Sequence, residues 1–277
     1  MSARRLWRHV PNGILVVVLV LLVFAPFYWI VISSFKTPPE VIRYPPTLVP
    51  LRLTLENFQK LFASTDYPRY LLNSVTIALA TTLITVPMAT LASYAVYRLD
   101  FPGRFLLLKL LVGTYVFPSI LLLIPLFQIM AQLGLVNSLW SLVVVNVTFT
   151  APFSVWLMRA FLESVPAELE EAAALDGAGF FQALWFVIFP ILRPGMATIG
   201  IFTFITVWTE YPFASQLIVE HARRPLPVGL ASIIGQYQID WGLLAAGAVF
   251  MVLPVVVLFA FVGRYFVEGL TTGALKS

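Results

Sequence analysis

Long apolar runs separated by short polar segments dominate the pattern of this chain. Each run approaches or exceeds the length of about 20 residues that a helix needs to cross the hydrocarbon core of a bilayer. The runs lie at residues 14–34, 71–97, 105–133, 139–161, 195–219 and 241–267. The pattern therefore predicts an all-α integral membrane protein with six transmembrane helices, preceded by a segment at 1–13 and followed by a tail at 268–277.

The polar stretches between the runs differ in length. Residues 35–69 form the longest of those expected outside the bilayer, and their prolines favour extended backbone. Within them the sequence LENFQKLF at 55–62 predicts a short amphipathic helix. Pro118 and Pro125 are expected to interrupt the third run.

Composition supports a membrane protein and narrows the chemistry. The chain is 60% hydrophobic and 11% charged, with a mean hydropathy of +0.92, whereas soluble domains carry about 25% charged residues. The absence of cysteine excludes a disulfide, a thiolate metal site and a cysteine nucleophile. His9 and His221 fall on opposite membrane faces in this topology, so we expect no metal site and no catalytic residues.

The basic residues predict an orientation. Of the 17 lysines and arginines, those close to the span ends fall mostly on the side of the N-terminus, which the positive-inside rule makes cytoplasmic. The first run is too long for a signal-peptide core, and no small-residue cleavage site follows it. We therefore expect an uncleaved first span, cytoplasmic termini, and residence in the cytoplasmic membrane of a prokaryote. The net charge of +4 reflects this bias rather than nucleic-acid binding.

The polar island at residues 163–194 breaks the apolar pattern between spans four and five. Its first half contains five carboxylates. Ser164 is a candidate helix N-cap, and Gly177 fits a helix stop. Residues 180–188 can form a second short helix, which Pro190 and Pro194 are expected to break. The island is either a solvated pair of helices or a docking surface whose alanine run permits close approach.

The island also carries a family signature. The pattern E-A-A-x3-G-x9-I-x-L-P is typical of the membrane subunits of binding-protein-dependent ABC importers. Glu171, Ala172, Ala173, Gly177 and Pro190 match it, while valine and phenylalanine replace its isoleucine and leucine. The segments SSFKTPPE, SYAVYRLDFPGR, IPLFQIMAQLGLVNS and GLTTGALKS extend the resemblance along the chain, which is most similar to the maltose-type carbohydrate branch.

This resemblance implies an ABC type I importer permease fold with a cytoplasmic coupling helix between spans four and five. Its implied partners are a second homologous permease subunit, an ATPase subunit dimer and an extracytoplasmic sugar-binding protein. Coupling to the ATPase would involve the following residues: Glu171, Ala172, Ala173, Asp176, Gly177 and Pro190. The tail residues 271–273 are further candidates for reaching the ATPase pair.

The chain lacks the means to hydrolyse nucleotide. A P-loop requires Gly-Lys-Ser/Thr, and none of the four lysines follows a glycine. We therefore expect no cofactor on this chain, with ATP and Mg²⁺ bound by the partner ATPase.

Polar and aromatic residues near the spans are candidates for the translocation path, because sugars bind through hydrogen bonds and stacked aromatic rings. These candidates are Asn73, Gln128, Asn146, Thr150, Trp208, Glu210 and Tyr211. Such residues also serve as polar contacts between membrane helices. Glu210 either faces the path or partners a hydroxyl or backbone group at a bend made by Pro212.

The loop at 220–240 is longer than a connector needs. It resembles the segment with which such permeases contact the binding protein. Its candidate contact residues are Arg223, Arg224, Gly229 and Gly235. The alternative is a plain connector.

Together with the resemblance, the sequence therefore predicts one half of an ATP-driven import path for a sugar, expected to be a di- or oligosaccharide. Two alternatives concern mechanism and cargo, namely a stand-alone proton-coupled secondary transporter that uses Glu210, and import of a sugar phosphate or glycerol phosphate. A six-span channel or scaffold is a third.

Overall fold

The fold was obtained as a computed structural model, which describes residues 3–234 and 239–274. These residues form helices and turns, with an isolated bridge between Ile234 and Ile239. Within the described residues, five helical stretches are long and apolar enough to cross a membrane: Leu15–Ser34, Tyr67–Arg98, Leu139–Leu162, Phe180–Trp208 and Trp241–Ala260. The chain divides into unit one, Met1–Pro68 with Leu230–Leu253, and unit two, Arg69–Gly229 with Pro254–Ser277.

Unit one is built on the long helix α1 and the first part of α13. Its elements are α1 (Ala3–Ser34), α2 (Pro38–Val41), α3 (Glu56–Ser64) and the beginning of α13 (Trp241–Ala274). The buried Asn57 amide donates to the carbonyls of Ser34, at 2.9 Å, and Lys36, at 2.8 Å. These bonds satisfy carbonyls that the end of α1 leaves free, so α3 is fixed to that end.

The segment between α1 and α3 is more ordered than its prolines predict. The structure confirms a short helix near 55–62 and adds α2, which begins with a proline pair. Glu40 is buried and accepts hydrogen bonds from the Thr47 hydroxyl, at 2.7 Å, and the Leu51 amide, at 2.8 Å. The bond from the Leu51 amide, followed by that from Thr47, lowers the pKa of Glu40. The loop therefore combines the expected helix near 55–62 with a helical turn at Pro38–Val41 that the prolines did not predict.

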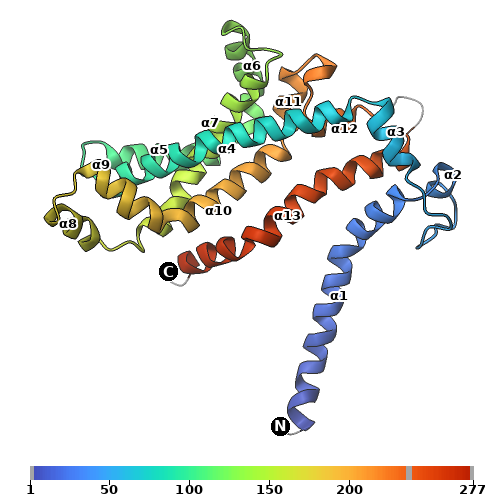
Figure 1. The fold of residues 1–277 in the computed structure, drawn as a ribbon, viewed down its shortest axis with the longest axis horizontal. Helices are drawn as coiled ribbons and strands as arrows, with labels where there is room; N and C mark the ends of the chain where they lie inside the picture. The colour runs from blue at the N-terminus through green and yellow to red at the C-terminus, as the bar shows by residue number, and fades with distance from the viewer. Residues whose placement is uncertain (1–2, 235–238, 275–277) are drawn as a thin grey trace. The chain divides into compact units, whose positions relative to one another are not determined.

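Unit two is a helical bundle around α7. Its long helices are α4 (Tyr67–Arg98), α5 (Arg104–Val116), α7 (Leu139–Leu162) and α10 (Phe189–Trp208). The short helices α6 (Leu123–Gln132) and α11 (Pro212–Leu217) lie near the start of α7, whereas α8 (Glu168–Leu175) and α9 (Phe180–Ala183) follow its end (Figure 1). The two ends of unit two therefore carry different short helices, α6 and α11 at one end and α8 and α9 at the other.

The third predicted run, 105–133, is not one continuous helix. α5 ends before Phe117, which takes the extended backbone expected of a residue preceding a proline. The short turn η1 (Ser119–Leu122) and then α6 follow. Pro118 interrupts the run as predicted. Pro125 does not, because it lies in the first turn of α6, where a missing amide costs little.

The predicted break at Pro190 and Pro194 is absent. α9 passes through a π turn, η2 (Leu184–Ile188), directly into α10, so one helical stretch runs from Phe180 to Trp208. A proline removes an amide and pushes on the carbonyl four residues earlier, and a π turn widens the helix at such a point. Pro190 lies at the start of α10, just after the widened turn, and so remains within the helical stretch.

The predicted fifth span, 195–219, ends earlier than expected. α10 stops at Trp208 and the chain turns into α11, which begins with Pro212. The Glu210 carboxylate accepts hydrogen bonds from the amides of Phe213, at 2.7 Å, and Ala214, at 3.0 Å. These bonds satisfy free amides at the start of α11, which makes a second helix more favourable than continuation of the first.

The first and last long helices of the chain, α1 and α13, are longer than the spans predicted for them. α1 begins at Ala3 rather than at residue 14, and α13 continues to Ala274 rather than ending at 267. A helix satisfies its own backbone in water as well as in lipid, so hydropathy marks the buried part of a helix rather than its ends. The segments 1–13 and 268–277, predicted as separate from the spans, are therefore largely helical within the described residues.

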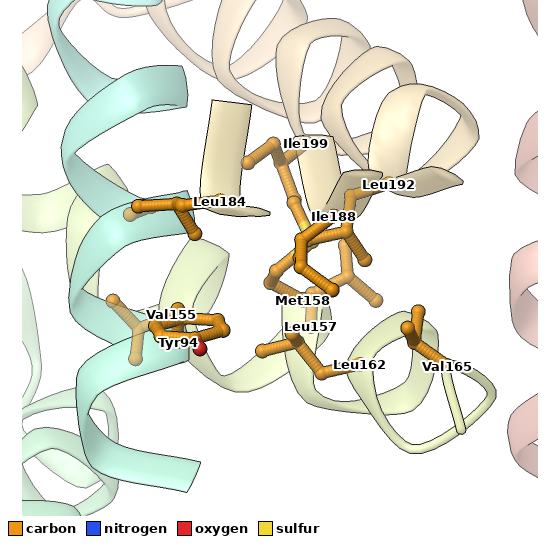
Figure 2. Close-up of a cluster of buried hydrophobic side chains, with 11 residues drawn as sticks. Tyr94, Val155, Leu157, Met158, Leu162, Val165, Leu184, Ile188, Leu192 and Ile199 are labelled. Carbon is orange, nitrogen blue, oxygen red and sulfur yellow. The ribbon is translucent and has the colours of Figure 1, made fainter. Parts of the chain in front are cut away.

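Buried apolar side chains join the four elements beneath α8 and α9. Figure 2 shows this cluster, in which Tyr94 of α4 meets residues of α7, the π turn and α10. Met158, Ile188 and Ile199 are fully buried within it. Helices in lipid associate through close packing of side chains, so the cluster is a firm base for the α8–α9 end of unit two.

We expect Gly229 to be intolerant of any side chain. It lies in α12 (Leu226–Ala231), and a Cβ added there would be 2.1 Å from the Tyr70 ring. Overpacking of this kind costs about 1–3 kcal/mol. Gly229→Ala should therefore lower thermal stability in detergent, whereas Gly200→Ala, whose Cβ would be 3.6 Å from the nearest side chain, should not. Equal stability of the two variants would contradict this packing.

Candidate functional site

The α8 helix has a well-formed C-terminal cap, whereas no side chain caps its N-terminus. The Gly177 amide donates to the Ala174 carbonyl and the Ala178 amide to the Ala173 carbonyl, with Gly177 at φ +85°. This is a Schellman motif, in which glycine takes the left-handed conformation. Gly177 thus ends the helix as predicted.

The prediction that Ser164 caps the start of α8 is wrong. The N-terminal flanking residue of α8 is Ala167, and the Ser164 hydroxyl donates to the Phe161 carbonyl at 2.6 Å. That carbonyl belongs to the last turn of α7, where free carbonyls compete for the hydroxyl. Ser164 therefore closes the preceding helix and does not begin the next one.

Most of the predicted coupling residues lie on the surface of α8. Glu171, Ala172 and Asp176 are exposed, as is Gly177. Ala173 is buried beneath them, and Pro190 is half-buried at the start of α10. The signature residues therefore divide between an outer face that a partner could reach and an inner face that holds the helix in place.

Large apolar side chains surround this outer face. Leu175 is 89% exposed, more than any other large apolar side chain of unit two for which exposure is described. Leu169 is also exposed, and five further exposed apolar residues of the island lie in the helical stretch Phe180–Trp208, which is long and apolar enough to cross a membrane, namely Phe180, Phe181, Trp185, Phe186 and Ile191. Outside that stretch, on α8, an exposed leucine beside carboxylates is typical of a protein-binding surface. We call residues 168–186 the docking segment, after the role proposed for them below.

The residues that fix the inner face of the docking segment carry no signal in the sequence. Glu170 accepts a hydrogen bond of 2.5 Å from the Tyr94 hydroxyl, and its other oxygen lies 3.4 Å from Nε of Arg98. In the sequence, Arg98 is one of several basic residues close to the span ends. It lies 72 positions before Glu170, and no local pattern signals a pairing at that distance.

A cavity of about 480 Å³ opens in unit two at the end that carries α11. It is lined by α5, η1, α7, α10 and the turn into α11. The lining residues are Thr114, Phe117, Pro118, Ser119, Leu122, Asn146, Thr148, Phe149, Pro152, Phe202, Thr206, Glu210, Pro212 and Phe213. Its volume falls in the range typical of small-molecule sites.

The cavity combines aromatic rings with hydrogen-bond acceptors. The hydroxyls of Thr114, Thr148 and Thr206 donate to carbonyls of their own helices, at 2.7, 2.9 and 2.8 Å. A hydroxyl that donates to its own helix keeps lone pairs for a ligand. Glu210 adds a carboxylate, and the lining residues include no lysine or arginine. The arrangement suits a ligand rich in hydroxyl donors and apolar ring faces.

The structure separates the predicted path residues. Asn146 and Glu210 line the cavity, whereas the other candidates are absent from its lining. Trp208 is fully buried, and its ring stacks on Phe204 at 5.5 Å. Thr150 is buried and lies 3.2 Å from the Thr85 hydroxyl. That contact joins α7 to α4, as polar residues in membrane helices often do.

The remaining path candidates lie away from the cavity lining. Gln128 and Tyr211 are exposed. The Asn73 amide donates to the carbonyls of Ala222, at 2.9 Å, and Arg224, at 3.0 Å. Asn73 therefore anchors the outer loop at the start of α4. The cavity would have been predictable from hydroxyls and aromatic rings that share one face of α7 and one face of α10. Recognising such faces requires knowing which residues of the two helices lie opposite one another.

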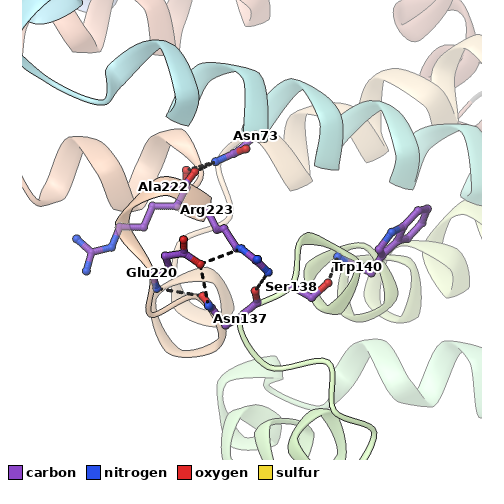
Figure 3. A network of polar contacts seen from close by, with 8 residues as sticks. Asn73, Asn137, Ser138, Trp140, Glu220, Ala222 and Arg223 are labelled. Atoms are coloured by element: carbon purple, nitrogen blue, oxygen red, sulfur yellow. Dashed lines mark hydrogen bonds and ion pairs between the residues drawn. The ribbon is translucent and has the colours of Figure 1, made fainter.

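The first part of the loop at 220–240 is fastened to the turn before α7 (Figure 3). Asn137, at φ +62°, accepts from the Glu220 amide at 3.0 Å and donates to the Glu220 carboxylate at 3.2 Å. Arg223 donates to the Asn137 carbonyl at 2.7 Å and pairs with Glu220. Asparagine tolerates left-handed backbone better than most residues, which is the one local clue to this junction.

The predicted contact residues of this loop have different surroundings. Arg223 is exposed although its guanidinium is engaged, and Arg224 is half-buried, with its guanidinium 3.0 Å from the His221 ring. Gly229 is buried against Tyr70. The prediction of an exposed position is wrong for Gly229, because α12 turns it inward. Gly235 lies outside the described residues.

The geometry defines a class of protein. A helical membrane chain with an exposed docking segment at one end of a bundle, and a polar cavity at the other, has the organisation of a transport component. Residues 86–271 match the family of binding-protein-dependent transport system inner membrane components.

Relatives with established names agree with this match. The trehalose/maltose transport system permease protein MalG of Thermococcus litoralis is 36% identical over 254 residues, which cover 91% of each chain. The sulfoquinovosyl glycerol transport system permease protein SmoH of Agrobacterium fabrum is 36% identical over 251 residues, 91% of this chain and 88% of that protein.

A solved structure has the same fold. It is a bacterial ABC transporter involved in the import of the acidic polysaccharide alginate, with a TM-score of 0.84 at 23% identity. The match covers 96% of this chain and 99% of that chain. The chain belongs to the binding-protein-dependent transport system inner membrane component family and has the fold of an ABC importer permease.

Proposed function

We propose that this chain is one of two permease subunits in an ATP-driven importer of a di- or oligosaccharide. It forms half of the translocation path and receives the sugar from an extracytoplasmic binding protein. A separate ATPase dimer binds ATP and Mg²⁺. In this arrangement both termini and the docking segment are cytoplasmic, which agrees with the distribution of basic residues at the span ends.

The observation that carries the proposal is the docking segment. Its outer face presents Glu171 and Leu175 one helical turn apart, above a buried core. An exposed leucine beside carboxylates suits a soluble partner with an apolar cleft and basic rim. Since the chain has no P-loop of its own, the partner that best fits this face is the ATPase.

The cavity supports a sugar as the cargo. Its hydroxyl oxygens, the Glu210 carboxylate and the Asn146 amide offer partners to sugar hydroxyls, and four phenylalanine rings offer apolar faces. A sugar phosphate or glycerol phosphate would bring an anion to a wall that contains a carboxylate and no cation. The relatives MalG and SmoH are named for transport of sugar-containing compounds, trehalose/maltose and sulfoquinovosyl glycerol.

The test is reconstitution of the chain in proteoliposomes. With the second permease subunit, the ATPase and the binding protein present, labelled disaccharide should enter only when ATP is supplied. The chain alone, under a pH gradient and without ATP, should show no uptake. Uptake by the chain alone would favour the proton-coupled alternative. Equal competition by glycerol phosphate for the binding protein would contradict sugar as the cargo.

A further inference from the structure

Three side chains meet where α4, α7 and the docking segment come together. The Tyr94 hydroxyl donates to one oxygen of Glu170 at 2.5 Å, and the other oxygen lies 3.4 Å from Nε of Arg98. Nη2 of Arg98 also donates to the carbonyls of Leu162, at 3.2 Å, and Val165. Arg98 therefore contacts both the end of α7 and the docking segment.

The ion pair of this cluster, Arg98 with Glu170, is better shielded from water than the neighbouring pair of Arg159 with Glu163. The side chains of Arg98 and Glu170 are 21% and 26% exposed, whereas those of Arg159 and Glu163, a pair at the end of α7, are 52% and 47% exposed. Exposed pairs contribute little, because water and salt screen them. Loss of one member of a shielded pair leaves the other charge without compensation. The contact with α4 should therefore be the stronger of the two.

The register of α8 separates two adjacent glutamates. Glu170 and Ala173 lie three residues apart and share the inner face, where Ala173 is buried. Glu171 and Leu175 lie four residues apart and share the exposed outer face. A partner that binds the outer face therefore presses on a helix whose inner face is fastened to α4.

Tyr94 fastens the second helix of the docking segment as well. Its ring lies 5.9 Å from that of Phe180 in α9, and it is buried within the apolar cluster of Figure 2. α8 and α9 therefore share one attachment residue on α4.

The opposite end of α4 is attached to the outer loop. Asn73 donates to the carbonyls of Ala222 and Arg224, and the Ser74 hydroxyl accepts from the Leu226 amide at 2.7 Å. Figure 3 shows the Asn73 contact beside the Asn137 junction. A helix of this length spans about 48 Å at 1.5 Å per residue. α4 thus joins the docking segment to the loop proposed to face the binding protein.

We propose that Tyr94, Arg98 and Glu170 are positioning residues that make α4 the element linking ATPase movement to the outer loop. The proposal rests on the function proposed above. It predicts that loss of the cluster uncouples hydrolysis from uptake without releasing the ATPase, because the outer face of α8 is unchanged. Stimulation of the ATPase by the binding protein should also fall, because in this proposal that signal passes through the same contact between α4 and the docking segment.

The experiment compares Glu170→Gln with Glu163→Gln in the full reconstituted transporter. Glu170→Gln keeps the side-chain shape and removes the charge, and Glu163→Gln does the same for the exposed pair. We expect Glu170→Gln to lower sugar uptake per ATP hydrolysed by about tenfold, a size typical of coupling between sites. Glu163→Gln should leave the ratio within about twofold of the wild type, as its exposed pair contributes little. ATPase stoichiometry after purification should be normal in both.

Tyr94→Phe provides a second variant that keeps the ring and its packing. It removes one hydrogen bond to Glu170 and should lower the same ratio in the same direction, by about threefold to tenfold. A normal ratio in both Glu170→Gln and Tyr94→Phe, with the complex assembled, would overturn the proposal. An equal loss in Glu163→Gln would also overturn it. Failure of the wild-type chain to retain any ATPase would instead contradict the proposed function.

Discussion

Replacement of Leu175 by aspartate is expected to abolish ATP-dependent uptake. Leu175 is 89% exposed at the end of α8, so its loss removes no contact within the chain. In a docked complex, however, it would enter an apolar cleft, and a carboxylate there would be buried without a partner. Central residues of an interface cost 2 kcal/mol or more when replaced, which weakens binding by about 30-fold. The measurement is ATPase retained by the purified membrane complex, together with uptake.

Leu53 supplies the matched control for this prediction. It is 75% exposed and lies in the loop of unit one between α2 and α3. Leu53→Asp makes the same chemical change at a site far along the chain from the docking segment. It should preserve ATPase retention and uptake. If Leu175→Asp retained the ATPase as well as Leu53→Asp does, the docking segment could not be the surface that binds it.

The parts of the fold that sequence could predict are those determined by hydropathy and by single residues. Long apolar runs identify a helical membrane protein, because within lipid a helix is one of the few structures that satisfy every backbone hydrogen bond. The all-helical permease fold is thus confirmed. Gly177 was identifiable as a helix stop because glycine alone takes its backbone conformation, φ +85°, without strain.

The ends and interruptions of the helices were harder to predict. Pro190 was expected to break the chain, yet the π turn before it keeps the helix continuous. The helical stretch continues because Leu184 and Ile188, the first and last residues of the π turn, are both buried in the apolar cluster. Glu210 shows the opposite case, because its carboxylate starts α11 and thereby ends the preceding helix early. Both outcomes depend on contacts, which hydropathy does not encode.

The candidate site was predictable only where it is local. The signature residues of the docking segment lie within one short stretch, so their pattern was visible. The pairing of Arg98 with Glu170 and the joining of Asn137 to Glu220 connect residues far apart in the chain. For the same reason the cavity was recognised only through Asn146 and Glu210. Its threonines appeared equivalent to those that join helices, such as Thr150.

The second large effect is expected at Thr206, in the wall of the cavity. Thr206 is exposed to the cavity from α10, and its hydroxyl donates to the Phe202 carbonyl at 2.8 Å. Thr206→Trp places an indole in the space that a sugar would occupy without disturbing a buried contact. Uptake should fall by more than tenfold, while the ATPase remains bound, because the docking segment lies at the other end of the bundle. Uptake of labelled disaccharide and ATPase retention are measured together.

Thr206→Val separates blockage of the cavity from loss of a polar contact. Valine has nearly the shape of threonine and removes only the hydroxyl oxygen, one of several acceptors in the cavity. A single hydrogen bond contributes about 0.5–1.5 kcal/mol, so uptake should fall by no more than about tenfold. If the tryptophan variant transported as well as the wild type, the sugar would have to pass elsewhere. A loss in Thr206→Val as large as in Thr206→Trp would mean that this hydroxyl, rather than the open volume of the cavity, controls passage.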